Sequence, residues 1–164
     1  MSQVERETLL IVDDDAINRA ILANIFESEY RILEAEDGLS GLQAVRENAD
    51  SLSAVLLDIV MPRLNGLEAL RELRGEGLTA RIPVFLITAD LTGAWMKEAY
   101  DLGVMDVIFK PVVPYIVRRR VNSVVELFRA RRRLGAEVER QRDQLLLQAQ
   151  QLAEMSTGMV EALS

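Results

Sequence analysis

The apolar residues of this chain cluster in five short runs that show no helical period. Runs of this kind are typical of β-strands that are covered on both faces, as in a parallel sheet. The third run ends at Asp58, and Pro62 prevents a simple continuation of the strand. The five predicted strands are residues 8–12, 30–35, 54–57, 83–87 and 104–109.

Segments with apolar residues at helical spacing follow these runs. Glycines mark two of the predicted helix ends, with Gly75 after the third helix and Gly103 after the fourth. Strands that alternate with helices through short connections predict an α/β fold with a doubly wound, five-stranded parallel sheet. The expected strand order is 2-1-3-4-5, the flavodoxin-like order, with a long C-terminal helix. The predicted helices are residues 16–26, a second from residue 39, residues 66–73 and 92–102, and a fifth from residue 114.

Four of the predicted strands end in polar side chains, namely Asp13 and Asp14, Asp58, Thr88 and Lys110. In an open parallel sheet these ends lie on one edge, where ligands usually bind. Clustered carboxylates repel one another, and Mg²⁺ relieves the repulsion because it prefers oxygen ligands. With Mg²⁺ bound, Asp58 stays ionised and can attack phosphorus, Thr88 can donate a hydrogen bond to a phosphoryl oxygen, and Lys110 can neutralise its charge.

The composition narrows the possible chemistry. The chain contains neither Cys nor His, which excludes disulfides, thiolate metal sites and a histidine phosphodonor within this sequence. No apolar run reaches the roughly 20 residues that span a bilayer, and residues 1–7 lack the apolar core of a signal peptide. A cytoplasmic protein that does not enter the membrane is therefore expected. Residues 1–114 carry a net charge of −10, which argues against a nucleic-acid surface there.

Four short motifs stand at the strand ends, and their joint spacing is more specific than any one of them. They are L-I-V-D-D at 10–14, L-D-I-V-M-P-R-L-N-G-L-E at 57–68, I-T-A at 87–89 and F-K-P at 109–111. Over residues 8–113 the sequence thereby resembles the response-regulator receiver domain of two-component signalling. This resemblance covers about two thirds of the chain.

The resemblance implies that Asp58 accepts a phosphoryl group from a histidine kinase or phosphotransfer protein. Thr88 and Lys110 are implied to contact that group, and the Lys110–Pro111 peptide is expected to be cis. Asn18 resembles the Asn of the family's D-D-x-x-x-N-R variant, with an ordinary surface residue as the alternative. The implied Mg²⁺ ligands are Asp13, Asp14, Asp58 and the backbone carbonyl of Val60.

One position departs from the family pattern and keeps two alternatives open. Receivers usually carry Tyr or Phe three residues before the lysine, and here that residue is Val107. Phe109 is aromatic, and strand alternation places it on the same side of the sheet as Val107. A degenerate receiver that acts only as a constitutive dimerisation module is therefore one alternative. An aspartate-nucleophile phosphatase is disfavoured, because such enzymes have D-x-D at the nucleophile strand and Val60 holds the second position. No enzyme activity beyond receiver-type self-phosphorylation and dephosphorylation is expected.

A single helical pattern runs from Pro114 to residue 155, where Ser-Thr-Gly at 156–158 is expected to end it. Its mostly apolar heptad positions are typical of a coiled-coil seam. Val at a with Leu at d favours a parallel dimer, and Glu137 at g faces Arg142 at the following e. A homodimer through this helix is expected, and a tail folded back on its own domain is the alternative. The a positions are Val124, Arg131, Val138, Leu145, Leu152 and Met159, and the d positions are Leu127, Leu134, Gln141, Gln148, Met155 and Ala162.

The Arg clusters at 118–120 and 131–133 lack interleaved aromatic residues and have Glu neighbours, which indicates solvated helix faces. No nucleic-acid partner is therefore expected. The predicted domains are a receiver at 1–113, a coiled-coil helix at 114–155 and, at 156–164, a linker or the start of an output domain. The last six residues, M-V-E-A-L-S, faintly resemble the opening helix of HD-type cyclic-di-GMP phosphohydrolases.

Overall fold

A computed structural model describes the backbone of residues 7–163 and the side chains of residues 7–158. The strands are β1 (Thr8–Val12), β2 (Arg31–Ala35), β3 (Leu52–Leu57), β4 (Val84–Thr88) and β5 (Asp106–Phe109). The helices are α1 (Ala16–Phe26), α2 (Gly38–Glu47), α3 (Gly66–Gly75), α4 (Met96–Asp101) and α5 (Pro114–Leu163), with a 3-10 turn η1 (Leu78–Ala80).

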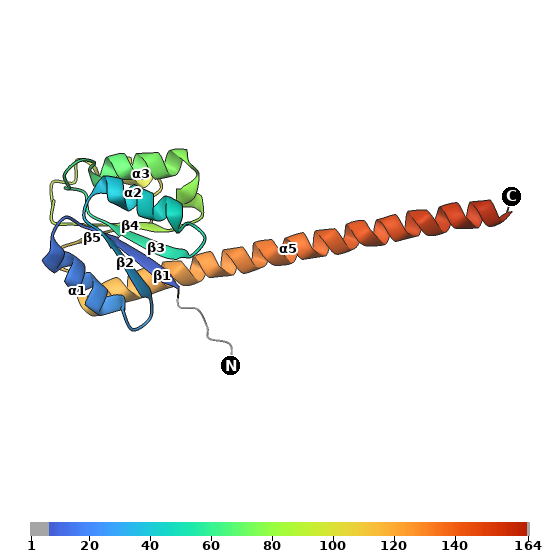
Figure 1. Ribbon diagram of the computed structural model, residues 1–164, viewed down its shortest axis with the longest axis horizontal. Helices are drawn as coiled ribbons and strands as arrows, with labels where there is room; N and C mark the ends of the chain where they lie inside the picture. Colours follow the sequence, from blue (N-terminus) through green and yellow to red (C-terminus); the bar gives the residue numbers. More distant parts are fainter. Residues whose placement is uncertain (1–6, 164) are drawn as a thin grey trace. The chain divides into compact units, whose positions relative to one another are not determined.

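The five strands form one parallel sheet in the order β2-β1-β3-β4-β5, which confirms the predicted fold class and strand order. Helices α2, α3 and α4 contribute to the core on one face, and α1 with the first turns of α5 covers the other (Figure 1). Every parallel connection passes through a helix, so the carboxyl ends of all strands lie on one edge of the sheet.

Alternation along the strands explains why the sequence shows unbroken apolar runs. In β1, Leu10 and Val12 pack in the layer of α2 and α3, whereas Leu9 and Ile11 pack in the layer of α1 and α5. All four side chains are buried. Because both faces of the sheet are covered, neither set of alternating positions tolerates polar residues, and a continuous apolar run results.

The fourth helix is shorter than predicted. The sequence predicts a helix from residue 92, whereas α4 begins at Met96. Before it, the Asp90 carboxylate accepts a hydrogen bond from the Thr92 backbone N–H at 2.9 Å, and Gly93 has φ of 70°. A residue in the left-handed region interrupts helical geometry, so the prediction from apolar spacing was wrong about the start. The predicted stop is confirmed, since Gly103 has φ of 95° close after the helix.

The first turns of α5 belong to the receiver. Val117, Val121 and Val125 are fully buried in the layer between α1 and the sheet. The compact unit that contains the sheet runs to Phe128, beyond the boundary predicted at 113. Val124, the first predicted seam position, is partly buried against the same core. Its side chain therefore contacts the receiver core in part, and its place in the coiled-coil seam stays a prediction.

The second unit, residues 129–164, is described only as the rest of α5. The helix does not end at 155 as expected, but passes through residues 156–158 and ends at Leu163. The Thr157 hydroxyl donates to the Ala153 carbonyl at 3.0 Å, and a single Gly costs a helix only about 1 kcal/mol. Met159, Ala162 and the M-V-E-A-L-S comparison lie outside the described side chains. Within residues 7–163 no helix is both long enough and apolar enough to span a membrane.

The N-cap of α2 yields a prediction about stability. The buried Asp37 carboxylate accepts hydrogen bonds from the Ser40 backbone N–H at 2.8 Å and the Ser40 hydroxyl at 2.9 Å. Asp37→Ala is expected to lower the free energy of unfolding near neutral pH by about 1–2 kcal/mol, measured by urea denaturation. Asp50→Ala is the control, because the Asp50 side chain is 98% exposed and its loss is expected to change little.

The same contribution should depend on pH in one direction. The Ser40 backbone N–H, opposed in part by burial, holds the pKa of Asp37 below its ordinary value. The unfolded chain therefore binds this proton at higher pH than the folded chain does, and acid removes the stabilisation. The difference in unfolding free energy between wild type and Asp37→Ala should be full above the ordinary Asp pKa and shrink as the pH falls through the lowered value. A pH-independent difference would contradict this account.

Candidate functional site

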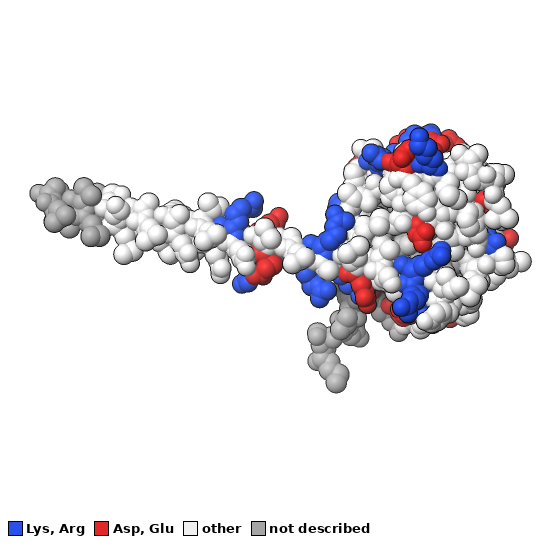
Figure 2. Space-filling model, turned by 180° about the vertical axis from the view of Figure 1, so that it is seen from behind, with Lys and Arg blue, Asp and Glu red and all other residues white. Residues whose placement is uncertain are grey.

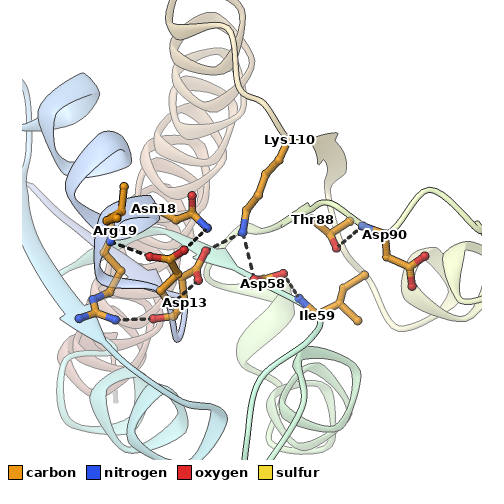
Figure 3. A network of polar contacts seen from close by, with 10 residues as sticks. Asp13, Asn18, Arg19, Asp58, Ile59, Thr88, Asp90 and Lys110 are labelled. Atoms are coloured by element: carbon orange, nitrogen blue, oxygen red, sulfur yellow. Dashed lines mark hydrogen bonds and ion pairs between the residues drawn. The ribbon is translucent and has the colours of Figure 1, made fainter.

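The carboxyl ends of four strands bring the predicted site residues to one edge of the sheet (Figure 3). These residues are Asp13 and Asp14 after β1, Asp58 after β3, Thr88 at the end of β4 and Lys110 after β5. One carboxylate oxygen from each of Asp13, Asp14 and Asp58 lies within 4.8 Å of the others. The three carboxylates therefore meet at one point, as the order of the strands requires.

The Lys110 ammonium bridges two of these carboxylates. Its Nζ donates to Asp13 Oδ2 at 2.8 Å and to Asp58 Oδ2 at 3.0 Å. Burial acts to lower the pKa of Lys110, but the hydrogen bonds to Asp13 and then Asp58 outweigh it, so the pKa is raised. Lys110 is therefore a permanent positive charge at neutral pH, placed where a phosphoryl oxygen on Asp58 would need one.

The Asp58 carboxylate is buried, with only 8% of the residue exposed. Desolvation raises the pKa of Asp58, and the nearby Asp13 charge adds to it, while Lys110 and the Ile59 backbone N–H act in the opposite direction. That N–H donates to Asp58 Oδ1 at 2.7 Å and fixes the carboxylate plane. The Lys110 ammonium acts against the effect of burial and favours the ionised form of Asp58. The ionised form is the nucleophilic form of a carboxylate.

The same residues fit a Mg²⁺ ion by the chemistry of their donor atoms. The cluster offers carboxylate oxygens only, which are the ligands that Mg²⁺ prefers, and Asp14 is exposed, so water can complete the coordination. The Asp15 backbone N–H donates to Asp13 Oδ1 at 2.9 Å and orients that carboxylate. Val60 follows Asp58 in the loop after β3, and the role of its carbonyl stays a prediction.

A residue that the sequence analysis missed holds the end of β1 in place. Arg19 Nη1 donates to the Asp13 backbone carbonyl at 2.7 Å (Figure 3). Arg19 Nε pairs with Glu34 at 3.3 Å. The sequence signal that could have identified Arg19 was its place as the last residue of the D-D-x-x-x-N-R pattern. Asn18 itself donates weakly to Asp15 Oδ2, at 3.4 Å, and contacts none of the three clustered carboxylates by a hydrogen bond in the described part of the chain.

Thr88 is buried, and its hydroxyl is turned toward the loop that follows β4. Its Oγ1 accepts a hydrogen bond from the Asp90 backbone N–H at 3.1 Å (Figure 3). On β5, Val107 is buried on the face of the sheet that α2 and α3 cover. The Phe109 ring lies against Trp95 of the same layer, with 6.4 Å between the ring centroids. Phe109 and Val107 therefore share a side of the sheet, as strand alternation predicted. The Lys110–Pro111 peptide is cis, also as expected.

Gly66 allows α3 to approach the end of β3. A Cβ at this position would lie 2.2 Å from the Asp58 carbonyl oxygen and 2.9 Å from Ile59 Cα. Gly66→Ala must therefore displace the backbone that carries Asp58. It is expected to cost about 1–3 kcal/mol of stability and to slow phosphate incorporation by about 100-fold, measured by urea denaturation and intact mass.

Gly75→Ala is the matched control for that substitution. Gly75 lies at the other end of the same helix, and a Cβ there meets nothing within 4 Å. Its replacement is expected to leave both stability and phosphate incorporation within about twofold of wild type, since Ala is the better helix former. Equal behaviour of the two variants would show that the approach of α3 to Asp58 has no functional consequence.

The sequence model of the response regulator receiver domain matches residues 9–122. The chain belongs to the response regulator receiver family. Its members are signalling switches of two-component systems that interact with histidine kinases and phosphotransfer partners and bind Mg²⁺ in an acidic pocket. The matched residues include the cluster of Asp13, Asp14 and Asp58. They also include the first turns of α5.

Curated relatives show what this receiver is similar to. It is 30% identical over 119 residues to chemotaxis protein CheY1 of Helicobacter pylori. This match covers 71% of this chain and 95% of that protein. It is 29% identical over its whole length to a probable cyclic di-GMP phosphodiesterase of Vibrio cholerae, of which it spans 37%. A 30% identical stretch of histidine kinase P4 of Formosa agariphila covers 77% of this chain and 9% of that protein. The receiver thus spans a minor part of two of these relatives.

Solved structures agree with the fold. The CheX-CheY-BeF3-Mg²⁺ complex from Borrelia burgdorferi contains a chain that is 28% identical, with a TM-score of 0.67, and the match covers 72% of this receiver and 88% of that chain. A CheY-like receiver domain from Methanospirillum hungatei is 25% identical with a TM-score of 0.68, covering 76% of this receiver and 98% of that chain.

Proposed function

We propose that this receiver is a phosphorylation-dependent signalling switch in which Asp58 accepts a phosphoryl group from the phosphohistidine of a histidine kinase or phosphotransfer protein. The observation that supports this proposal most strongly is the environment of the Asp58 carboxylate. It is buried at the end of β3 and accepts a hydrogen bond from Lys110 at 3.0 Å. The oxygens of Asp13 and Asp14 lie within 4.8 Å of it. The donor histidine lies outside this sequence, because the sequence contains no His.

The transfer is a displacement at phosphorus. A carboxylate oxygen of Asp58 bonds to phosphorus while the P–N bond to the donor imidazole breaks, and the electron pair leaves with the imidazole nitrogen. Lys110 already contacts Asp58, so its ammonium is in place for a phosphoryl oxygen, and the Thr88 hydroxyl donates to another. The proposed Mg²⁺ ligands are Asp13, Asp14, Asp58 and the Val60 carbonyl. When bound, Mg²⁺ would neutralise charge on the transferring group.

An apolar surface beside the site suits the partner that presents the phosphohistidine. Ile17 and Ile21 on α1 are 71% and 46% exposed, and Val113 before α5 is 54% exposed. Ile21 also lines a pocket that reaches Lys110 and Pro111. Apolar side chains of this size at the surface support docking of a partner next to Asp58.

We also propose that the tail passes the phosphorylation state on as a parallel homodimeric coiled coil. Large apolar side chains at seam positions of residues 129–158 are exposed in a single chain, namely Leu134, Val138, Leu145, Leu152 and Met155. Within one helix Glu137 pairs with Arg140 at 2.6 Å, and across a dimer it would also face Arg142. The similarity to the Vibrio cholerae protein extends over the tail, which supports treating the tail as part of the signalling unit.

The second candidate function is a receiver that dimerises constitutively without responding to phosphate. Val107 favours it, because a small buried side chain cannot swing between interior and surface as an aromatic one can. The intact acidic cluster and Lys110 favour the switch instead.

Incubation with acetyl phosphate and Mg²⁺, followed by intact mass measurement, tests the choice between the two. The switch predicts one phosphoryl adduct per chain, which disappears when a chelator removes the metal. Absence of the adduct at saturating phosphodonor, with the dimer unchanged, would support the constitutive module.

A further inference from the structure

The link between β4 and α4 carries a buried polar group that the phosphoryl chemistry does not use. Trp95 is 8% exposed and packs in the same core layer as Val107. Its indole Nε1 is buried and lacks a hydrogen-bond partner of normal geometry. A buried N–H without a partner costs free energy, so any rearrangement that brings an acceptor to it is favoured.

The Asp90 carboxylate is the acceptor on the same link. Hydrogen bonds from the Thr92 backbone and side chain hold the pKa of Asp90 below its ordinary value, and the Trp95 N–H contributes to a smaller extent. Asp90 Oδ1 accepts a hydrogen bond from the Thr92 backbone N–H at 2.9 Å. The indole therefore lies near the carboxylate, but the two do not form a well-aligned hydrogen bond in this conformation.

Asp90 is also tied to the phosphoryl site. Its backbone N–H donates to Thr88 Oγ1 at 3.1 Å, on the side away from Asp58 (Figure 3). When Thr88 donates its hydroxyl to a phosphoryl oxygen on Asp58, the hydroxyl turns toward Asp58. Thr88 then either releases the Asp90 N–H, which leaves Asp90 free to move relative to Trp95, or draws Asp90 with it.

The Trp95 ring lies against an aromatic side chain of β5. Val107 is small and buried, and Trp95 contacts the Phe109 ring at a centroid distance of 6.4 Å and an interplanar angle of 52°. Phe109 is 37% exposed. A shift of the indole is therefore passed directly to an exposed side chain on β5.

We propose that Trp95 is the aromatic residue that couples Thr88 to the surface of this receiver, and that its indole N–H binds the Asp90 carboxylate when Asp58 is phosphorylated. Trp95 does not touch the reacting atoms, so it acts as a positioning residue through Asp90. This inference rests on the proposed phosphorylation of Asp58, and it supplies the aromatic switch that Val107 cannot provide.

The sequence makes the test direct, because Trp95 is the sole tryptophan. Fluorescence of the full chain is recorded with Mg²⁺ before and after addition of beryllofluoride, a phosphoryl mimic. The emission maximum is expected to shift to longer wavelength, because a hydrogen bond from the indole N–H to an acceptor oxygen stabilises the excited indole. Asp90→Asn keeps an acceptor oxygen and should keep the shift, whereas Asp90→Ala should lose it. Both variants keep the backbone N–H that Thr88 accepts.

A parallel intact-mass measurement with acetyl phosphate separates the possible failures. An adduct in all three proteins, with the emission shift lost only in Asp90→Ala, supports the coupling. A normal adduct without an emission shift in wild type, or with an equal shift in Asp90→Ala, overturns the role of Trp95 alone. Absence of any adduct in wild type overturns the proposed function and the coupling with it. Circular dichroism of each variant excludes loss of the fold as the cause of a missing shift.

Discussion

Asp58→Asn is expected to lower the phosphate adduct formed with acetyl phosphate and Mg²⁺ by at least about 100-fold, the scale on which removal of one active-site group acts. The amide is almost isosteric with the carboxylate, although its single oxygen can accept the hydrogen bond of either Lys110 or Ile59 and not both. It is, however, a neutral group and cannot attack phosphorus as an anion does. The loss would therefore report the nucleophile itself and not a collapse of the site.

The control for this variant is a carboxylate outside the site. Asp101→Asn makes the same chemical change at an exposed residue at the end of α4 and should leave the intact-mass adduct unchanged. Mg²⁺ removal from wild type should reproduce the effect of Asp58→Asn, because the three neighbouring carboxylates then repel the anionic donor. An adduct in Asp58→Asn equal to that of wild type would falsify the assignment of the acceptor.

Leu145→Asp is expected to dissociate the proposed homodimer, whereas Leu146→Asp is expected to leave it intact. The two side chains are matched, at 66% and 63% exposed in a single chain. Leu145 lies at an a position of the seam, and Leu146 lies outside the seam. Loss of a seam leucine costs about 2–5 kcal/mol, so the dissociation constant should rise by about 30-fold or more, measured by sedimentation velocity.

The local surroundings of the two residues are otherwise alike. Residues 144–153 contain no charged side chain, and the tail helix between its last coloured cluster and the grey end is white in Figure 2. Arg142 lies three residues before Leu145 and four before Leu146, so it is a helical neighbour of the added charge in both variants. A truncated chain should end after Phe128, because Val125 and Phe128 are buried in the receiver. A full chain that is monomeric at concentrations on the order of tens of micromolar would remove the coiled coil from the function.

Local patterns in the sequence were enough to predict the sheet and the edge on which the site lies. Five apolar runs that alternate with helical segments leave few arrangements, because crossovers between parallel strands are right-handed and short. A strand followed by Asp58 and another followed by Lys110 must then present these residues at the same edge. The place of these residues at the strand ends was therefore sufficient to predict which side chains lie together.

The assignment of α5 faces needed the tertiary structure. One helix carries two apolar stripes, one with Val117, Val121 and Val125, and one with Leu134 and Val138 farther along. Helical period identifies both stripes but does not say which partner covers each. Packing against α1 and the sheet decides it for the first stripe, and Val124 next to that stripe is partly buried against the same core.

The sequence by itself determined the order of the elements and the polar residues that follow the strands, since these depend on neighbours one to four positions apart. Only the tertiary structure decided which atoms meet. Lys110 bonds to Asp13 across 97 residues of chain, and Arg19 holds the Asp13 carbonyl from the first turn of α1. The hydrogen bond from Asp90 to Thr88 and the burial of Trp95 likewise depend on how the β4–α4 link packs, which apolar spacing mistook for helix. Contacts of this kind depend on the packing of the whole domain, and no local period encodes them.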